Sequence, residues 1–198
     1  MVWSLQQRIF LGQVVNYGHL MQITDDPNWN HVNVRLFLLE ESHVGATYVG
    51  WMADPGINQF LESRFSAHDE ASIRAYVGAM RQSPTNLFCG IHSLDLDRYV
   101  GNIKLGPIDR EHQRGEIGIM IGDRDAWGLG IGSAAISAIC AIAKHELGLR
   151  KITAGCYAGN VGSQKAFEKA GFSVEGVRSR HFILNGQDED LVLLAKFI

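Results

Sequence analysis

Apolar residues recur at helical spacing in several parts of the chain. Behind Ser66-Ala67-His68-Asp69, which resembles a capping box, one apolar helical face is predicted from Ile73, Tyr76, Val77 and Met80. A longer helix is predicted to follow the glycine-rich residues 128–132, and its apolar face comprises Ile136, Ile139, Cys140, Ala143 and Leu147. Weaker helical patterns cover residues 42–52, ending near Asp54-Pro55-Gly56, and residues 163–170.

Short apolar runs predict the strands of one sheet. They cover residues 32–39, 87–94, 99–105, 115–121, 151–157, 172–181 and 191–197. Only short turn-forming segments separate the runs between residues 87 and 121, which is typical of an antiparallel meander. Asn185-Gly186, a favoured hairpin turn, joins the last two runs. The pattern predicts an α/β (α+β) fold, a mixed and mostly antiparallel sheet of about seven strands flanked by helices.

The length and hydrophobic content of the chain predict one domain. The chain has 198 residues, of which 46% are hydrophobic, enough for a sizeable single core. Residues 1–30 mix Gln, Asn and Gly with isolated apolar residues, and the turn formers of residues 24–28 separate them from the first predicted strand. We expect residues 1–30 to be an extension of unknown role and residues 31–198 to form the single domain.

Composition narrows the function classes and the compartment. A net charge of −3 supplies no general attraction for nucleic acid or for an anionic membrane, so neither partner is expected. The first ten residues lack the apolar core of a signal peptide, and no window approaches a membrane span. The three cysteines are too few and too scattered for a disulfide framework. These features predict a cytoplasmic protein. We expect it to be a monomer or a homodimer.

The segment most typical of a ligand-binding site is a glycine-rich turn between a strand and a helix. It reads Trp127-Gly128-Leu129-Gly130-Ile131-Gly132-Ser133. Glycines let a ligand approach the backbone, and the free N–H groups of the first helical turn suit a phosphate or diphosphate. The alternative is a purely structural role, in which the glycines only permit a tight turn and close helix packing.

Two other nucleotide-binding motifs fit this segment poorly. A P-loop requires Gly-Lys-Ser/Thr, which the chain does not contain. A dinucleotide fingerprint requires a third glycine, where this chain has Ser133, and a carboxylate at the end of the next strand. That predicted strand ends Ala154-Gly155-Cys156-Tyr157, without a carboxylate. The P-loop is therefore excluded, and a hydride-transfer enzyme is a poor second interpretation.

Several motifs in order resemble the GNAT acyltransferase superfamily. They are Ile119-Met120-Ile121, the turn at residues 127–132, Asn160-Val161-Gly162-Ser163 and Phe167-Glu168-Lys169-Ala170-Gly171-Phe172. The resemblance covers about residues 35–197 and is strongest from Glu116 onward. Within the superfamily, the chain is most similar to the acetyltransferases that modify ribosomal-protein amino termini. Trp127 departs from the Gln or Arg that is commonest at its position.

The resemblance implies an acetyl-CoA site between two splayed neighbouring strands. In such proteins the strand that corresponds to Ile119, Met120 and Ile121 binds the pantetheine arm through its backbone. The loop that corresponds to Trp127, Gly128, Leu129, Gly130, Ile131, Gly132 and Ser133 wraps the diphosphate. The motif implies a further cofactor contact at Asn160, which could instead be a turn former.

Acetyl transfer to an amine needs a base, oxyanion donors and an acid for the departing thiolate. Glu116 is the candidate base, and its alternative role is an exposed carboxylate at a strand end. Main-chain N–H groups near Met120 are the candidate oxyanion donors. Ser163 matches a serine of the ribosomal-protein subgroup that can protonate the thiolate and contact the cofactor, or else it caps the following helix. Many superfamily members use a tyrosine where this chain has Phe167.

The base of the closest subgroup does not transfer to this chain. That subgroup carries a glutamate near His181, but the aligned residue here is Phe182. His181 is therefore a second candidate base, because histidine titrates near neutral pH. The eight histidines show no His-x-x-x-His or His-Glu-x-x-His spacing, so no metal is expected.

The acceptor stays open at this stage. The closest subgroup implies a protein N-terminal amine, and a small amine fits the same chemistry. Gly101-Asn102-Ile103-Lys104-Leu105-Gly106-Pro107 resembles enzymes of surface-sugar pathways, which favours an amino sugar or sugar nucleotide as the alternative acceptor. A catalytically weak CoA-binding module is a further alternative, because Phe167 has no proton to give.

Overall fold

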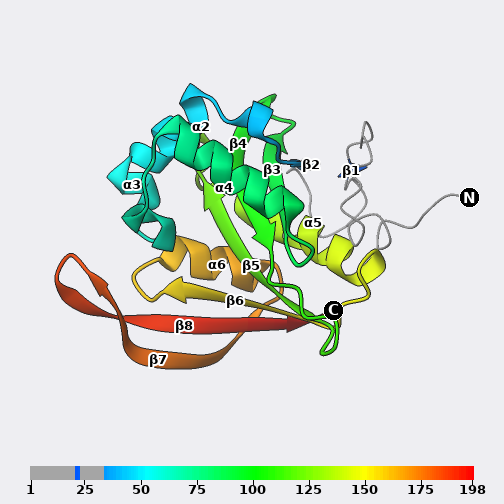
Figure 1. The fold of residues 1–198 in the computed structure, drawn as a ribbon. Helices are drawn as coiled ribbons and strands as arrows, with labels where there is room; N and C mark the ends of the chain where they lie inside the picture. The colour runs from blue at the N-terminus through cyan, green and yellow to red at the C-terminus, as the bar shows by residue number, and fades with distance from the viewer. Residues whose placement is uncertain (1–20, 23–33) are drawn as a thin grey trace, which may run out of the picture.

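A computed structural model of the chain describes residues 21–22 and 34–198, which form one sheet with helices on both faces (Figure 1). The strand order is β1-β2-β3-β4-β5-β6-β8-β7, and of the strand pairs in the described residues only β5–β6 is parallel. The strands are β1 (Met21–Gln22), β2 (Val34–Leu38), β3 (Leu87–Ser93), β4 (Arg98–Leu105), β5 (Arg114–Ile121), β6 (Lys151–Tyr157), β7 (Ser173–Leu184) and β8 (Gln187–Phe197). The predicted mixed and mostly antiparallel sheet is confirmed, with the two-residue β1 added at one edge.

Two apolar clusters lie on opposite faces of the sheet. The larger packs α5 (Ile131–His145) and the buried side of α6 (Val161–Lys169) against the strands. The smaller packs α2 (Ala46–Ala53) and α4 (Glu70–Gln82) against the other face, which Figure 1 shows toward the viewer. Side chains alternate along β5, so Ile117 belongs to the first cluster and Met120 to the second. We call these the α5 face and the α2/α4 face.

On the α2/α4 face, the predicted end of α2 agrees with the structure, whereas the cap of α4 differs from the predicted one. The α4 helix begins at Glu70, and its N-cap is Asp69, whose Oδ1 accepts from Ser72 N at 2.9 Å. The predicted cap segment at Ser66 is therefore placed one helical turn too early. The α2 helix ends at Ala53, and Pro55 then starts the short α3 (Pro55–Asn58), because proline is favoured in a first helical turn. The 3₁₀ turns η1 (Glu41–His43), η2 (Glu62–Phe65) and η3 (Arg124–Ala126) complete the connections.

The last hairpin is longer than the apolar pattern predicts. Asn185 and Gly186 have φ values of 50° and 78°, as a two-residue primed turn requires, so the predicted turn is confirmed. The ladder continues up to this turn through Leu184 and Gln187, whereas the apolar pattern predicts β8 only from Leu191. The added β8 residues 187–190 are all polar, so no hydrophobic periodicity marks this part of β8, although their partners on β7 include Phe182, Ile183 and Leu184. Of the predicted extension, residues 21–22 pair with β2, and the other residues of 1–30 lie outside the described residues.

Candidate functional site

The parallel strands β5 and β6 pair along only part of their length. Their ladder joins residues 114–117 to residues 151–154 and ends there. Beyond it, β5 continues to Ile121 beside β4, and β6 continues to Tyr157 beside β8. The two strands therefore separate, and their facing edges carry main-chain groups that no strand satisfies. We call this feature the strand opening.

The direction of the β5 backbone decides which groups face the strand opening. Glu116 O accepts from Gly106 N at 2.7 Å, and Gly122 N donates to Val100 O at 2.9 Å, so the even positions of β5 face β4. Main-chain groups alternate along a strand, so those of Ile119 and Ile121 face the opening. The indole Nε1 of Trp127 donates to Ile121 O at 2.9 Å. By this alternation the backbone of Met120 faces β4, so Ile119 and Ile121 are the main-chain candidates for a ligand.

The glycine-rich turn adopts the backbone that a cradle for an anion needs. Gly128 and Gly130 have φ values of 77° and 80°, in the left-handed region that favours glycine. Gly130 is the N-cap of α5 and offers no side-chain cap to the free N–H groups of the first turn. Ser133 is buried, and its hydroxyl donates to Gly130 O at 2.8 Å. The side chain of Ser133 thus stabilises the turn and leaves the N–H groups as the donors that a ligand could use.

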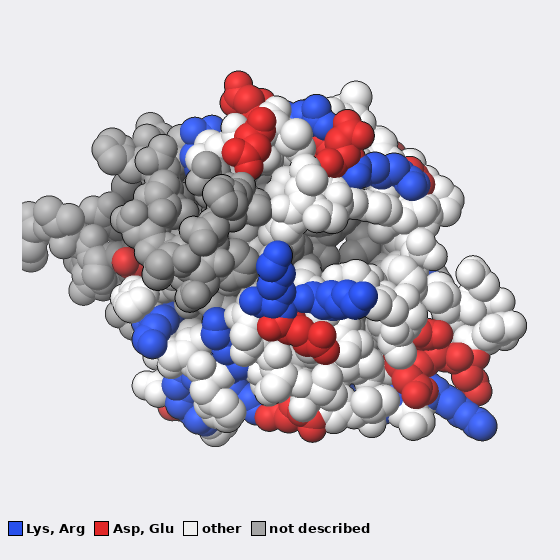
Figure 2. All heavy atoms as spheres, turned by 180° about the vertical axis from the view of Figure 1, so that it is seen from behind, with Lys and Arg blue, Asp and Glu red and all other residues white. Residues whose placement is uncertain are grey.

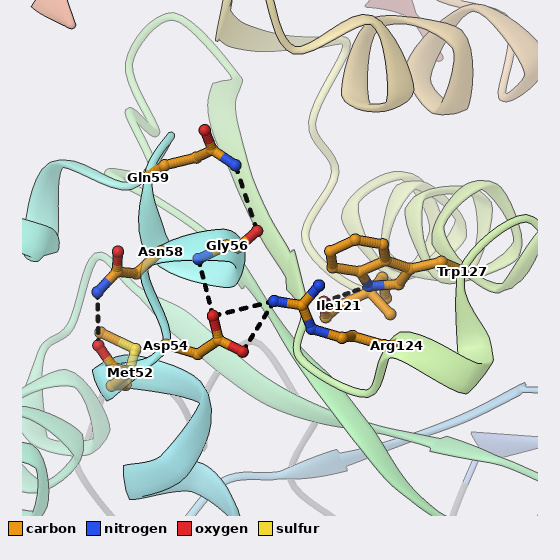
Figure 3. Close-up of polar contacts among 8 residues, drawn as sticks. All are labelled: Met52, Asp54, Gly56, Asn58, Gln59, Ile121, Arg124 and Trp127. Atoms are coloured by element: carbon orange, nitrogen blue, oxygen red, sulfur yellow. Dashed lines mark hydrogen bonds and ion pairs between the residues drawn. The ribbon is translucent and has the colours of Figure 1, made fainter. Parts of the chain in front are cut away.

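Contacts to α3 fix the segment that leads into this turn (Figure 3). Arg124 Nη2 lies 3.0 and 2.9 Å from the two carboxylate oxygens of Asp54. Asp54 Oδ1 also accepts from Gly56 N at 2.7 Å and caps α3, which holds the carboxylate in place. The Arg124 guanidinium lies 5.2 Å from the ring centroid of Trp127. We call residues 46–58, which contain α2 and α3, the α2–α3 arm. Arg124 therefore joins this arm to the segment that leads into the glycine-rich turn.

The structure assigns the cap of α6 to Asn160, and the predicted capping by Ser163 is wrong. The helix begins at Val161, and Asn160 Oδ1 accepts from Ser163 N at 3.2 Å. Ser163 is the third helical residue, so it receives the cap and does not provide it. The starts of α5 and α6 are neighbours, since a Cβ at Gly132 would lie 3.7 Å from Ala166 Cβ, an ordinary contact distance. The Asn160–Ser163 segment and the glycine-rich turn therefore belong to neighbouring helix starts.

Glu116 lies on the α2/α4 face. It alternates with Ile117 and shares its side of the sheet with Gly118 and Met120. A Cβ added at Gly118 would meet no atom of the described residues within 4 Å, so among them this part of the face is open. Within the described part of the chain, the exposed Glu116 side chain makes no ion pair. Its carboxylate is thus free to contact a ligand beside the strand opening.

Phe167 and Phe182 have packing roles. Phe167 is 2% exposed, and its ring centroid lies 5.1 Å from that of Phe172 in the α5-face core. Phe182 stacks on Tyr157 at 4.0 Å and 10°. His181 is exposed and contacts Phe182 edge-on at 4.8 Å. None of the three presents an acid or base at the strand opening through these contacts.

A polar network at the end of β6 was not found from the sequence. The Tyr157 hydroxyl donates to Glu62 and accepts from Arg64 Nη1 at 2.7 Å. Arg64 also donates to Ile183 O at 3.3 Å, which ties η2 to the β7–β8 hairpin. These partners lie 93 to 119 residues apart in the sequence, so no local motif marks them.

Figure 2 shows the face behind that of Figure 1, where positive and negative side chains are interspersed around a central hollow.

The described residues contain no cluster of three or more His, Cys, Asp or Glu side chains placed to bind a metal. No helix in residues 21–22 and 34–198 is long and apolar enough to cross a membrane.

Comparisons with known proteins agree on one family. A family model described as an acetyltransferase (GNAT) domain matches residues 33–173. The probable N-acetyltransferase YjcK of Bacillus subtilis (strain 168) is 37% identical over 107 residues, or 54% of this chain. The match spans 59% of that relative's own length.

Solved structures share the fold at low identity. A spermidine N-acetyltransferase from Vibrio cholerae, in complex with CoA and spermine, is 19% identical, with a TM-score of 0.72 over 83% of this chain and 95% of that one. The ribosomal-protein-S5-alanine acetyltransferase from Vibrio fischeri is 17% identical, with a TM-score of 0.73 over 89% and 96% of the two chains. These likenesses show that the fold is shared.

Proposed function

Because the chain belongs to the GNAT acetyltransferase family, we propose that it transfers the acetyl group of acetyl-CoA to a primary amine. The observation that carries the proposal is the strand opening between β5 and β6, followed directly by an uncapped glycine turn into α5. The opening offers main-chain groups for an amide-containing arm, and the turn offers N–H groups for a diphosphate. CoA contains both of these groups in one molecule.

The proposed cofactor contacts come from three segments. Ile119 and Ile121 pair with the pantetheine arm through their backbone, with Met120 between them. The turn from Trp127 to Ser133, which includes Gly128, Leu129, Gly130, Ile131 and Gly132, surrounds the diphosphate. Asn160 and Ser163 complete the site from the start of α6, which lies beside the start of α5. No metal takes part in this proposal.

The chemistry divides between two side chains. An α-amine has a pKa near ~8 and a lysine amine near ~10.4, so a base must remove a proton before the neutral amine attacks the thioester carbon. Glu116 takes this proton, directly or through a water, because its carboxylate is free on the α2/α4 face. The tetrahedral intermediate then expels the CoA thiolate. The Ser163 hydroxyl gives this thiolate a proton and takes up the second proton that the nitrogen loses, directly or through a water, so the serine ends the cycle as a hydroxyl. His181 is the second candidate base.

The acceptor is proposed as a protein N-terminal amine or a small amine. Solved relatives are named for spermidine and for a ribosomal protein, so both acceptor types occur on this fold. An amino sugar or sugar nucleotide is the alternative acceptor, and a catalytically weak CoA-binding module is the alternative function, which the buried Phe167 favours. We place the activity in residues 31–198, with residues 1–30 as an extension, in a cytoplasmic monomer or homodimer.

Thermal melting with acetyl-CoA and, in parallel, with NADH tests the cofactor. A ligand at about 100 times its dissociation constant stabilises the folded state by about 2.7 kcal/mol. We expect acetyl-CoA alone to raise the melting temperature. Stabilisation by NADH alone would favour a dinucleotide enzyme, and no shift with either ligand would contradict the cofactor site.

Variants of Glu116 and Ser163 then separate an enzyme from a binding module. We expect Glu116→Gln and Ser163→Ala each to lower kcat for CoA thiol release by about 10²-fold or more, the usual lower bound of acid–base contributions. The melting shift with acetyl-CoA should persist in both. Glu146→Gln, an exposed change at the far end of α5, serves as the control. Unchanged turnover would remove both residues from the mechanism.

A further inference from the structure

Asn102 carries a buried hydrogen-bond donor that no described residue accepts. The residue lies in the middle of β4 and is 3% exposed. The hydroxyl of Tyr99 donates to Asn102 Oδ1, which fixes the orientation of the amide. Asn102 Nδ2 is fully buried and has no hydrogen-bond partner among residues 21–22 and 34–198. Buried polar groups are nearly always paired in native proteins, so this exception requires an explanation.

The position of Asn102 points to the acceptor side of the proposed site. Its partner across the β4–β5 ladder is Met120, and directly opposed residues in an antiparallel pair share one face. Asn102 therefore lies on the α2/α4 face, the same face as Glu116, and one strand away from the strand opening. Lys104, the next β4 residue on this face, opposes Gly118, where the face is open.

The surroundings make an unpaired amide costly. The Trp51 and Tyr99 ring centroids are 4.9 Å apart, and Tyr48 and Trp51 lie 6.3 Å apart in the same cluster. Burial raises the pKa of Tyr99, and the nearby phenol of Tyr48 raises it further. In such a weakly polar layer a satisfied hydrogen bond is stronger than in water and an orphan group is less favourable. Leucine would fill the same volume without this cost.

Asn58 shows how the same side chain is satisfied elsewhere. Asn58 is 8% exposed, and its Nδ2 donates to Met52 O at 2.6 Å (Figure 3). Both asparagines are buried around the same helical layer, but only Asn58 uses its amide to hold the fold. The contrast separates a structural asparagine from one whose donor is kept for another partner.

We propose that Asn102 donates its free N–H to an oxygen atom of the acceptor, so that the acceptor carries a hydroxyl or carbonyl oxygen close to its amine. This inference rests on the proposed acetyl transfer and narrows its acceptor class. Amino sugars and peptide amino termini have such an oxygen, whereas polyamines have none. A site built to hydrogen-bond a substrate group discriminates strongly against an analogue that lacks it, because the buried donor then stays unpaired.

The test compares three amines in the CoA thiol-release assay. Glucosamine and glycinamide carry an oxygen near the amine, and spermidine carries none. We expect the wild-type protein to prefer one of the first two over spermidine by about 10²-fold or more in kcat/KM. Equal or better use of spermidine, or no turnover of either oxygen-bearing amine, would overturn the inference. The melting shift with acetyl-CoA, measured in parallel, reports separately on the proposed function.

Substitutions at Asn102 identify the donor itself. Asn102→Asp keeps the shape but replaces the N–H by an acceptor, and Asn102→Leu removes both polar atoms. We expect each to lower kcat/KM for the preferred amine by about 10-fold or more and to leave kcat/KM for spermidine and the acetyl-CoA melting shift unchanged. The matched control Asn58→Asp should lower the melting temperature without changing the preference. An unchanged preference in folded Asn102→Leu would mean that the amide binds only a buried water and would overturn the proposal.

Discussion

At the scale of single residues, the three cysteines show how burial controls reactivity. Cys89, Cys140 and Cys156 are free and buried. Burial raises the pKa of Cys89 to about 12 and those of the other two to about 11. Because the thiolate is the reactive form, all three should be nearly inert at pH 8.

This reactivity can be measured directly with Ellman's reagent. We expect no fast-reacting thiol in the native protein at pH 8 and three after denaturation. The result also decides whether CoA release can be followed with the same reagent without background. A fast native reaction would contradict the burial of at least one cysteine.

Asn160 tests a residue with two proposed roles, as a helix cap and as a cofactor contact. Asn160→Asp keeps an N-cap acceptor for α6, so the melting temperature should stay the same or rise. The added negative charge should repel the phosphates of CoA and raise its Kd by about tenfold, or about 1.4 kcal/mol. Both quantities come from melting with and without ligand.

Asn185→Asp adds the same charge in the β7–β8 turn and should leave the Kd unchanged. If Asn160→Asp behaves like this control, Asn160 is a cap and no more. If it instead lowers the melting temperature, the cap geometry itself is in question.

Sequence reasoning at this scale identified positions more reliably than roles. The motif around Asn160 and Ser163 was found in the sequence. Which of the two caps α6 depends on where the helix begins, and it begins two residues before the predicted start. The free donor of Asn102 and the network of Tyr157, Arg64 and Glu62 depend on long-range packing, so no local pattern marks them.

At the scale of elements, the proposed binding role of the glycine turn before α5 can be tested apart from the conformational cost of replacing a left-handed glycine. Gly128 and Gly148, on either side of α5, have φ values of 77° and 65°, and a Cβ at either position would meet no atom within 4 Å. Alanine is unfavourable in this backbone region, so Gly128→Ala and Gly148→Ala should each destabilise by about 1 kcal/mol.

Only Gly128→Ala should also weaken the binding of CoA, by about tenfold in Kd, because its backbone conformation shapes the proposed diphosphate cradle. Chemical unfolding gives the stability of each variant, and isothermal titration with CoA gives its Kd. Equal affinities of the two variants would indicate that the turn at residues 127–133 is structural.

Elements with a buried face were predictable, and those defined by tertiary contacts were not. The pattern located β6 at residues 151–157 because buried residues alternate along it with less buried ones. The strand opening could be expected only from the family resemblance, because no residue of β5 or β6 marks where pairing stops. The turn end of the β7–β8 ladder was missed because residues 187–190 are polar and give β8 no apolar pattern there.

At the scale of the whole molecule, charged pairs join segments that lie far apart in the chain. Arg98 pairs with Asp123 and Asp125, and Arg124 pairs with Asp54. The pairs are partly exposed, so each contributes little to stability by itself. Their collective role is positional, since they hold the segment before the glycine turn to β4 and to the α2–α3 arm.

These pairs and the carboxylate caps make the stability of the fold sensitive to acid. Hydrogen bonding to Arg124 lowers the pKa of Asp54, hydrogen bonding to the His112 amide lowers that of Asp109, and hydrogen bonding to Arg98 lowers that of Asp123. A group with a lowered folded-state pKa stabilises the fold above its unfolded pKa, near ~3.9 for Asp, and loses this contribution as the pH falls through the folded value. We expect the urea midpoint to be nearly constant from pH 7 to about 5 and to fall progressively below about 4.

Repeating the series in 1 M NaCl should reduce the dependence of the urea midpoint on pH, because salt screens exposed pairs. A midpoint that rises below pH 4 would contradict the assigned directions, and Asp54→Asn should flatten the curve in part because it removes one of the titrating groups.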